Sequence, residues 1–240
     1  ASTGNLLYAL AQKRCAEFGT CATTTDSSTI AAVNTNVQSV TGFAKQGKDL
    51  LYHQVGCNDA NLDLAFKGMV SQMTVPLVQG MLKYAWKADP AKGDSCDGQA
   101  GNNAATVAAN DDGAGTDCAK SWAEGWAFAA AVLPQVHQCD ATAATTIKAN
   151  LDVASTEPMK DGVAAVKAAI EGVYDCLGIT CTDVGEYQAS GMVKSGMDAC
   201  TFAPANDVDS TTSSGATVPM DTDSAGSDDK KSNNSLVVIL

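Results

Sequence analysis

Apolar residues recur at spacings of three or four along most of the chain, which is the period of one face of an α-helix. The clearest stripe predicts a helix over 159–177, with Pro158 near its start and Gly178 as its C-terminal cap. Other stripes predict helices over 28–55, 60–87, 118–138, 4–18, 141–153 and 183–198. No segment shows the two-residue alternation of a half-buried strand. The pattern predicts an all-α bundle of six or seven helices.

Two regions interrupt the helical pattern. Residues 88–117 are rich in Gly, Asp, Asn and Ala and predict a long irregular loop, a feature that is usually functional or mobile. From residue 204 onward the chain is rich in Ser, Thr and Asp, and such a segment cannot bury enough apolar surface to offset the entropy of ordering. We therefore expect a bundle domain over 1–203 and a disordered tail over 204–240.

The last five residues, 236–240, are all apolar and follow two lysines and a short polar stretch. One interpretation is a short sticky end. The other is the start of a membrane anchor that continues beyond residue 240, which would be the protein's one contact with a membrane.

The net charge of −12, from 15 basic and 27 acidic residues, argues against a nucleic-acid partner, because such proteins carry a basic footprint. It permits cationic ligands, including metal ions. The chain lacks the G-x-S-x-G, P-loop and H-E-x-x-H motifs and has only two histidines. We therefore do not expect an enzyme.

The nine cysteines contain no C-x-x-C pair, which favours a disulfide framework over a zinc site. Disulfides place the protein in an oxidising compartment, so we expect it to be secreted, periplasmic or on the cell surface. Spacing and similar helix ends predict four bonds: Cys15–Cys21, Cys96–Cys118, Cys176–Cys181 and Cys57–Cys139. The odd count leaves Cys200 over.

His137 and Asp140 are three residues apart, a spacing that lets a histidine and a carboxylate of a helix bundle face one ion. Each has a structural alternative: His137 as a hydrogen-bonded core residue, and Asp140 as the N-cap of the next helix. A ferric ion prefers hard oxygen donors, such as the phenol of Tyr52 or the carboxylate of Glu124. Glu124 falls on the opposite helix face from Trp122, so a solvated carboxylate is its alternative. The predicted metal ligands are His137, Asp140, Tyr52 and Glu124.

Three stretches, residues 7–21, 70–80 and 122–134, resemble the algal iron-assimilating protein family. These are low-iron-inducible periplasmic or cell-surface proteins and include the diatom phytotransferrins. The resemblance implies a surface protein that captures ferric ion for high-affinity iron uptake, with carbonate as a synergistic anion. It supplies no ligand motif, so the predicted ligands rest on the residue arguments alone. The competing hypothesis is a non-catalytic interaction or structural module of the cell envelope.

Overall fold

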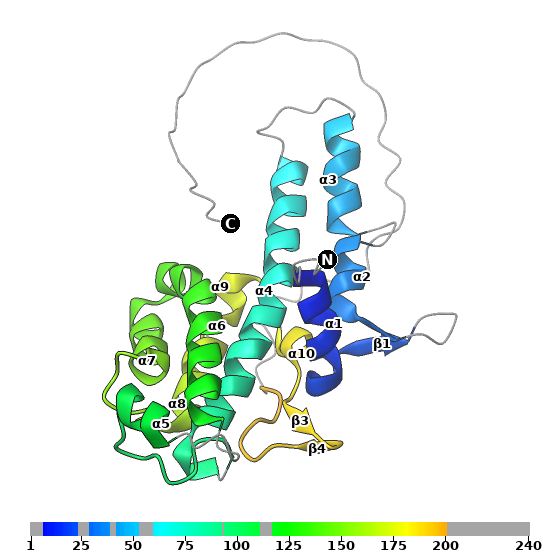
Figure 1. Cartoon of the computed structure of the whole chain (residues 1–240). Coiled ribbons are helices and arrows are strands. Elements are labelled where there is room, and N and C mark those ends of the chain that lie inside the picture. Colours follow the sequence, from blue (N-terminus) through cyan, green and yellow to red (C-terminus); the bar gives the residue numbers. More distant parts are fainter. Residues whose placement is uncertain are drawn as a thin grey trace, which may run out of the picture. The chain divides into compact units, whose positions relative to one another are not determined.

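A computed structural model describes residues 7–23, 29–38, 42–52, 60–92, 94–110 and 117–200. This part of the chain is mostly helical (Figure 1). Its α-helices are α1 Leu7–Phe18, α2 Ala32–Gln38, α3 Phe43–Tyr52, α4 Ala60–Ala88, α5 Ala104–Asn110, α6 Cys118–Cys139, α7 Ala141–Leu151, α8 Gly162–Glu171, α9 Tyr174–Leu177 and α10 Cys181–Val184. The prediction of an all-α fold stapled by disulfides is confirmed.

Short strands form two antiparallel pairs within the described residues. Strand β1 (Cys21–Thr23) pairs with β2 (Thr29–Ala31), and β3 (Gln188–Ala189) pairs with β4 (Met192–Val193). A single 3₁₀ turn, η1 (Pro90–Lys92), follows α4.

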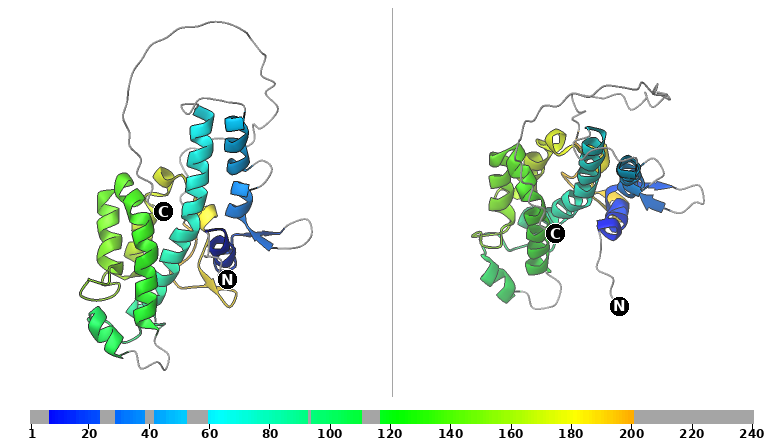
Figure 2. Two further views of the ribbon diagram at one scale, coloured as in Figure 1. Left: turned by 45° about the horizontal axis from the view of Figure 1, so that its top comes forward. Right: turned by 90° about the horizontal axis from the view of Figure 1, so that it is seen from above.

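Helices α4 and α6 pack against each other at the centre of the bundle, with α7 against α6 and α8 against both α7 and α4 (Figures 1 and 2). Helices α1, α2 and α3 cover other parts of α4. Two glycines permit the close approach of α4 and α6. A Cβ on Gly80 of α4 would lie 2.7 Å from the Phe128 ring of α6, and one on Gly125 of α6 would lie 3.3 Å from Tyr84 Cβ of α4.

The helices predicted over 60–87 and 118–138 are confirmed as α4 and α6. Two other predicted helices and the predicted loop are wrong as continuous elements. The predicted helix over 28–55 is divided into β2, α2 and α3. The one over 159–177 begins only at residue 162, after the left-handed residue Met159, and is interrupted between α8 and α9. The predicted loop over 88–117 contains η1 and α5.

The predicted helix over 183–198 is also wrong. Helix α10 ends at Gly185, whose φ of 73° and ψ of −156° lie outside the conformations that L-residues favour. Gly191, with φ 74°, turns the chain between β3 and β4. These glycines convert an apparent helical segment into a hairpin.

The disulfides confirm two predicted bonds, Cys15–Cys21 and Cys96–Cys118. The predicted bonds Cys176–Cys181 and Cys57–Cys139 are wrong, because the structure pairs Cys139–Cys176 and Cys181–Cys200. Helix α9 packs against α6, which brings Cys176 to the last residue of α6. The expectation that Cys200 is unpaired is therefore also wrong, and Cys57 lies outside the described residues.

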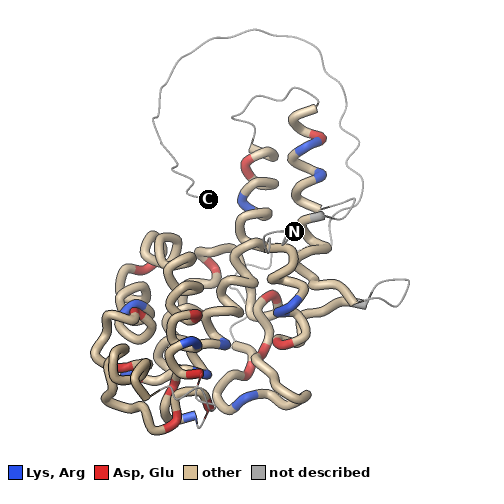
Figure 3. Tube along the Cα trace, viewed as in Figure 1, with Lys and Arg blue, Asp and Glu red and all other residues tan. Residues whose placement is uncertain are grey.

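In the described part of the chain, no helix is both long enough and apolar enough to cross a bilayer. The predicted tail over 204–240, with its apolar end, lies outside the described residues, so the predicted domain boundary stays a prediction. Acidic and basic residues are interspersed along the described helices (Figure 3).

Candidate functional site

The structure gives His137 and Asp140 different surroundings, and neither is a buried ligand. His137 is exposed near the end of α6. Asp140 caps α7, because its Oδ1 accepts hydrogen bonds from the backbone N–H groups of Thr142 (2.7 Å) and Ala143 (3.3 Å). The N-cap alternative for Asp140 is thus confirmed. Among the described residues, no three His, Cys, Asp or Glu side chains are grouped closely enough to hold a metal ion.

The other two predicted ligands also lie apart. Tyr52, the last residue of α3, is 80% exposed. Glu124 lies thirteen residues before His137 on α6, a distance of about 20 Å along a helix. The four predicted ligands therefore do not form one site. Glu124 is half-buried, and it lies close enough to the phenol of Tyr84 on α4 to raise the pKa of that phenol.

Tyr84 belongs to a group of side chains from α1, α4 and α6 that we call the Arg14 cluster: Arg14, Glu17, Lys83, Tyr84, Glu124 and Phe128. Arg14 is only 2% exposed. Its guanidinium carbon lies 5.3 Å from the centre of the Tyr84 ring and 5.4 Å from that of Phe128. The two rings stack on each other with centres 5.8 Å apart. A cation thus lies against two aromatic faces in the interior.

The charges of the cluster are paired through one carboxylate. Glu17 accepts a hydrogen bond from Arg14 Nη1 at 2.5 Å and another from Lys83 Nζ at 2.6 Å. The Lys83 and Glu17 side chains are 15% and 25% exposed, so the pair lies where the cluster meets solvent. Glu124 supplies the second carboxylate, and the formal charge of the cluster is zero.

Burial and these contacts set the protonation states of the cluster. Burial raises the pKa of Tyr84, and the neighbouring Glu124 carboxylate raises it further, against the opposing effect of Arg14. Burial also raises the pKa of Glu17, but hydrogen bonds from Lys83 and Arg14 outweigh it, so the pKa lies below its ordinary value. Burial lowers the pKa of Lys83 more than Glu17 raises it. At neutral pH the cluster therefore combines a neutral Tyr84 phenol with an ionised Glu17 carboxylate.

One polar atom of the cluster has no hydrogen-bond partner in the described residues. It is Arg14 Nε, which is buried. A guanidinium is a forked donor that suits planar oxyanions, and an unpaired buried donor costs free energy until a partner arrives. Phenol and carboxylate oxygens are the donors that a hard metal ion prefers. The cluster therefore holds groups for both a hard cation and an oxyanion.

Sequence reasoning identified only Glu124 of this cluster. A signal was present, because Ala11, Arg14, Cys15 and Phe18 follow the three- and four-residue spacing of one face of α1. All four are buried. Glu17 lies three positions after Arg14, a spacing at which opposite charges on a helix are neighbours, so a basic residue on this apolar stripe had an acidic partner within reach.

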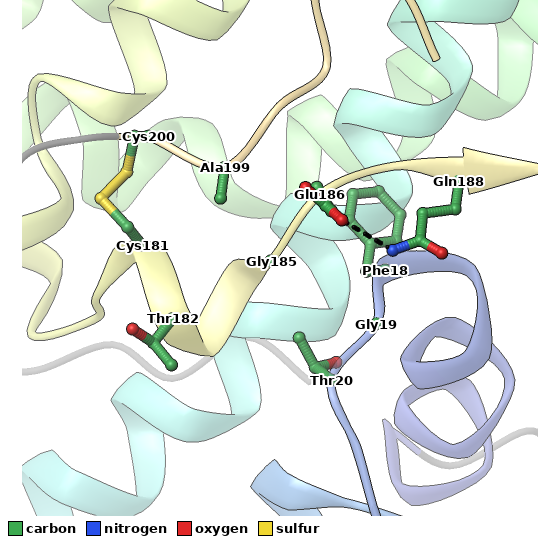
Figure 4. A pocket seen from close by; sticks show the side chains of 10 residues that line it. All are labelled: Phe18, Gly19, Thr20, Cys181, Thr182, Gly185, Glu186, Gln188, Ala199 and Cys200. Carbon is green, nitrogen blue, oxygen red and sulfur yellow. Dashed lines mark hydrogen bonds between the residues drawn. A yellow bond between two sulfur atoms is a disulfide. The ribbon is translucent and has the colours of Figure 1, made fainter. Parts of the chain in front are cut away.

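A hollow of about 310 Å³ lies at the C-terminal end of α1 (Figure 4). It forms where the turn after α1 meets the chain that follows α10. Its lining residues are Phe18, Gly19, Thr20, Cys181, Thr182, Gly185, Glu186, Gln188, Ala199 and Cys200.

Comparisons with known proteins add no relative: no family model matches the chain, and neither the curated proteins nor the solved structures give a significant match. Arguments about function therefore rest on the residues and on the sequence resemblance.

Proposed function

We propose that this protein binds ferric ion outside the cell, with Tyr84 and Glu124 as oxygen donors and with an anion such as carbonate beside Arg14 and Lys83. One observation carries the proposal: a phenol and a carboxylate in contact, next to a buried guanidinium that has an unpaired N–H. The four disulfides suggest an oxidising environment. The resemblance to algal iron-assimilating proteins favours ferric ion among the hard cations.

The electrostatics of the cluster suggest how capture would work. The raised pKa of Tyr84 keeps its phenol protonated, so binding of the ion requires release of that proton to solvent, which leaves both the phenolate and the Glu124 carboxylate as donors. An oxyanion would accept a hydrogen bond from the unpaired Arg14 Nε–H and lie near Lys83. Its negative charge would offset the electrostatic repulsion between a trivalent ion and these two cationic side chains. Binding should therefore strengthen with added bicarbonate and weaken as the pH falls.

The test is a titration with Fe³⁺, with and without bicarbonate, followed by visible absorption. We expect a tyrosinate-to-iron charge-transfer band that requires bicarbonate. Tyr84→Phe should abolish the band, and Tyr52→Phe is the matched control that should retain it. Absence of both the band and micromolar binding would refute the proposal. Loss of the band in the Tyr52 variant alone would move the site to α3.

The competing function, a non-catalytic interaction module, has its own supporting observation. Leu51 and Tyr52 at the end of α3, and Leu64 and Phe66 near the start of α4, are between 44% and 80% exposed. Neighbouring exposed apolar side chains often mark a contact surface. Elemental analysis of protein purified from its source without chelators separates the two functions: iron at near one equivalent favours capture, and its absence favours the module.

A further inference from the structure

The hollow on α1 has a chemistry different from that of the Arg14 cluster. Two loops build it, and both depend on glycine. A Cβ on Gly185 would lie 2.1 Å from the carbonyl oxygen of Phe18, and one on Gly19 would lie 3.0 Å from the Gln188 amide. The backbone N–H of Glu186 donates to the same Phe18 oxygen at 3.2 Å. The close approach of the loops therefore fixes the shape of the hollow.

The floor and the flanks of the hollow are held by buried contacts. Gln79 of α4, 1% exposed, donates from its Nε2 to Thr20 Oγ1 at 3.2 Å and to the carbonyl of Val184 at 2.9 Å. The disulfide Cys15–Cys21 closes one loop and Cys181–Cys200 closes the other. A concave surface held in this way loses little conformational freedom when it receives a ligand.

Only one ionised side chain lines the hollow. Figure 4 shows the Glu186 carboxylate beside the Gln188 amide, which donates to it at 2.9 Å, with the Cys181–Cys200 disulfide on the far side. No lysine, arginine or histidine is among the lining residues. In the described part of the chain, no ion pair joins Glu186 to a cationic side chain. A half-buried carboxylate without a counter-charge attracts a cation.

The lining also indicates which kind of cation fits. Calcium takes six to eight oxygen ligands, and one carboxylate with two threonine hydroxyls falls short of that. The volume lies at the small end of the roughly 300–1,000 Å³ range of small-molecule sites. Phe18, Ala199 and the disulfide supply apolar walls, while Glu186, Thr20 and Thr182 supply acceptors. We propose that this hollow binds a small organic cation of the primary-ammonium class, with its N–H groups on Glu186 and its carbon chain against the apolar walls.

The test follows backbone amide NMR shifts of the whole protein during titration with butylammonium, with n-butanol and butyrate as neutral and anionic analogues. We expect saturable shifts at residues 19–20 and 182–188 with butylammonium, and much weaker ones with both analogues. Glu186→Gln keeps the shape and the contact with Gln188, and it should weaken binding at least about tenfold because a charge-assisted hydrogen bond is lost. Glu157→Gln, at another half-buried glutamate, is the matched control and should bind normally.

Three results would overturn this assignment. The first is equal binding of butanol, which would remove the role of charge. The second is an unchanged affinity in the Glu186 variant. The third is tighter saturation of the same amides by Ca²⁺ than by butylammonium, which would make the hollow a metal site. None of these outcomes depends on iron binding at the Arg14 cluster.

Discussion

Replacement of Arg14 tests whether the cluster is a tightly packed interior site. Arg14→Ala removes contacts with two aromatic rings, each worth about 0.5–2 kcal/mol, and leaves a cavity where the side chain was fully packed. Glu17 keeps its bond to Lys83, so its charge is not left unpaired. We expect Arg14→Ala to lower the free energy of unfolding by about 2–5 kcal/mol, the usual cost of truncating a large buried side chain.

Arg14→Met separates packing from charge. Methionine fills much of the same volume, removes the unpaired Nε and escapes the cost of burying a guanidinium. Replacing a buried ion by an apolar side chain of similar size is often neutral, so we expect a change within about 1 kcal/mol. The neighbouring Lys13 is exposed, and Lys13→Ala should change stability by less than about 0.5 kcal/mol.

The assay is urea unfolding under non-reducing conditions, followed by circular dichroism at equilibrium. A lower midpoint at unchanged slope reports a change in stability rather than in the unfolded state. A loss of less than about 1 kcal/mol in Arg14→Ala would refute the tight packing. Equal losses in the Ala and Met variants would instead show that the guanidinium itself stabilises the bundle, against the desolvation argument.

Three further predictions concern the framework. Replacing Cys139 and Cys176 by Ala should lower the free energy of unfolding by about 4 kcal/mol, the value of a chain-entropy model for a separation of 37 residues, in the same unfolding assay. Peptide mapping of the unmodified protein should recover the Cys139–Cys176 bond and not Cys176–Cys181. Gly185→Ala should lower the free energy of unfolding by about 2–4 kcal/mol, because φ is +73° and the new Cβ would clash with a backbone carbonyl. Gly98→Ala is the control: φ is +72° but no atom lies within 4 Å of the new Cβ, so the loss should be about 1–2 kcal/mol. Burial, together with the nearby Glu17 charge, raises the pKa of Tyr187 to about 12. The unfolded chain loses this proton near pH 10, so the free energy of unfolding should fall between about pH 10 and 12, by at most about 1.4 kcal/mol per pH unit for this group. Absorbance at 295 nm should show ionisation of tyrosine together with unfolding.

The long helices could be predicted from the sequence because their apolar spacing continues for many turns without a conformational break. Helices α4 and α6 even pass through Pro76 and Pro134. The segment around residue 30 has the same spacing, yet Thr29–Ala31 forms a strand because β1 lies beside it as a partner. Periodicity describes one face of one segment, and it carries no information about a partner that tertiary structure supplies.

The disulfides show the same limit. The two confirmed bonds close local segments, with separations of 6 and 22 residues. Cys176 and Cys181 are closer in sequence than Cys96 and Cys118, yet each has a more distant partner. Between them, Gly178 adopts a left-handed conformation and ends α9, so the two cysteines belong to different helices. The bond of Cys176 follows from the packing of α9 on α6, which spacing cannot report.

The two candidate sites depend on α1 and not on the predicted loop over 88–117. Arg14 and Phe18 are four residues apart, so they share the buried face of α1, with one in the cluster and the other in the wall of the hollow. The bond Cys15–Cys21 closes the turn directly after this helix and thereby holds both positions. The segment 88–117 was predicted as a long irregular loop, of a kind that is usually functional or mobile, but its described residues contribute neither to the cluster nor to the lining of the hollow. In this bundle, the end of a disulfide-stapled helix therefore brings a buried charged side chain, Arg14, next to the packed core.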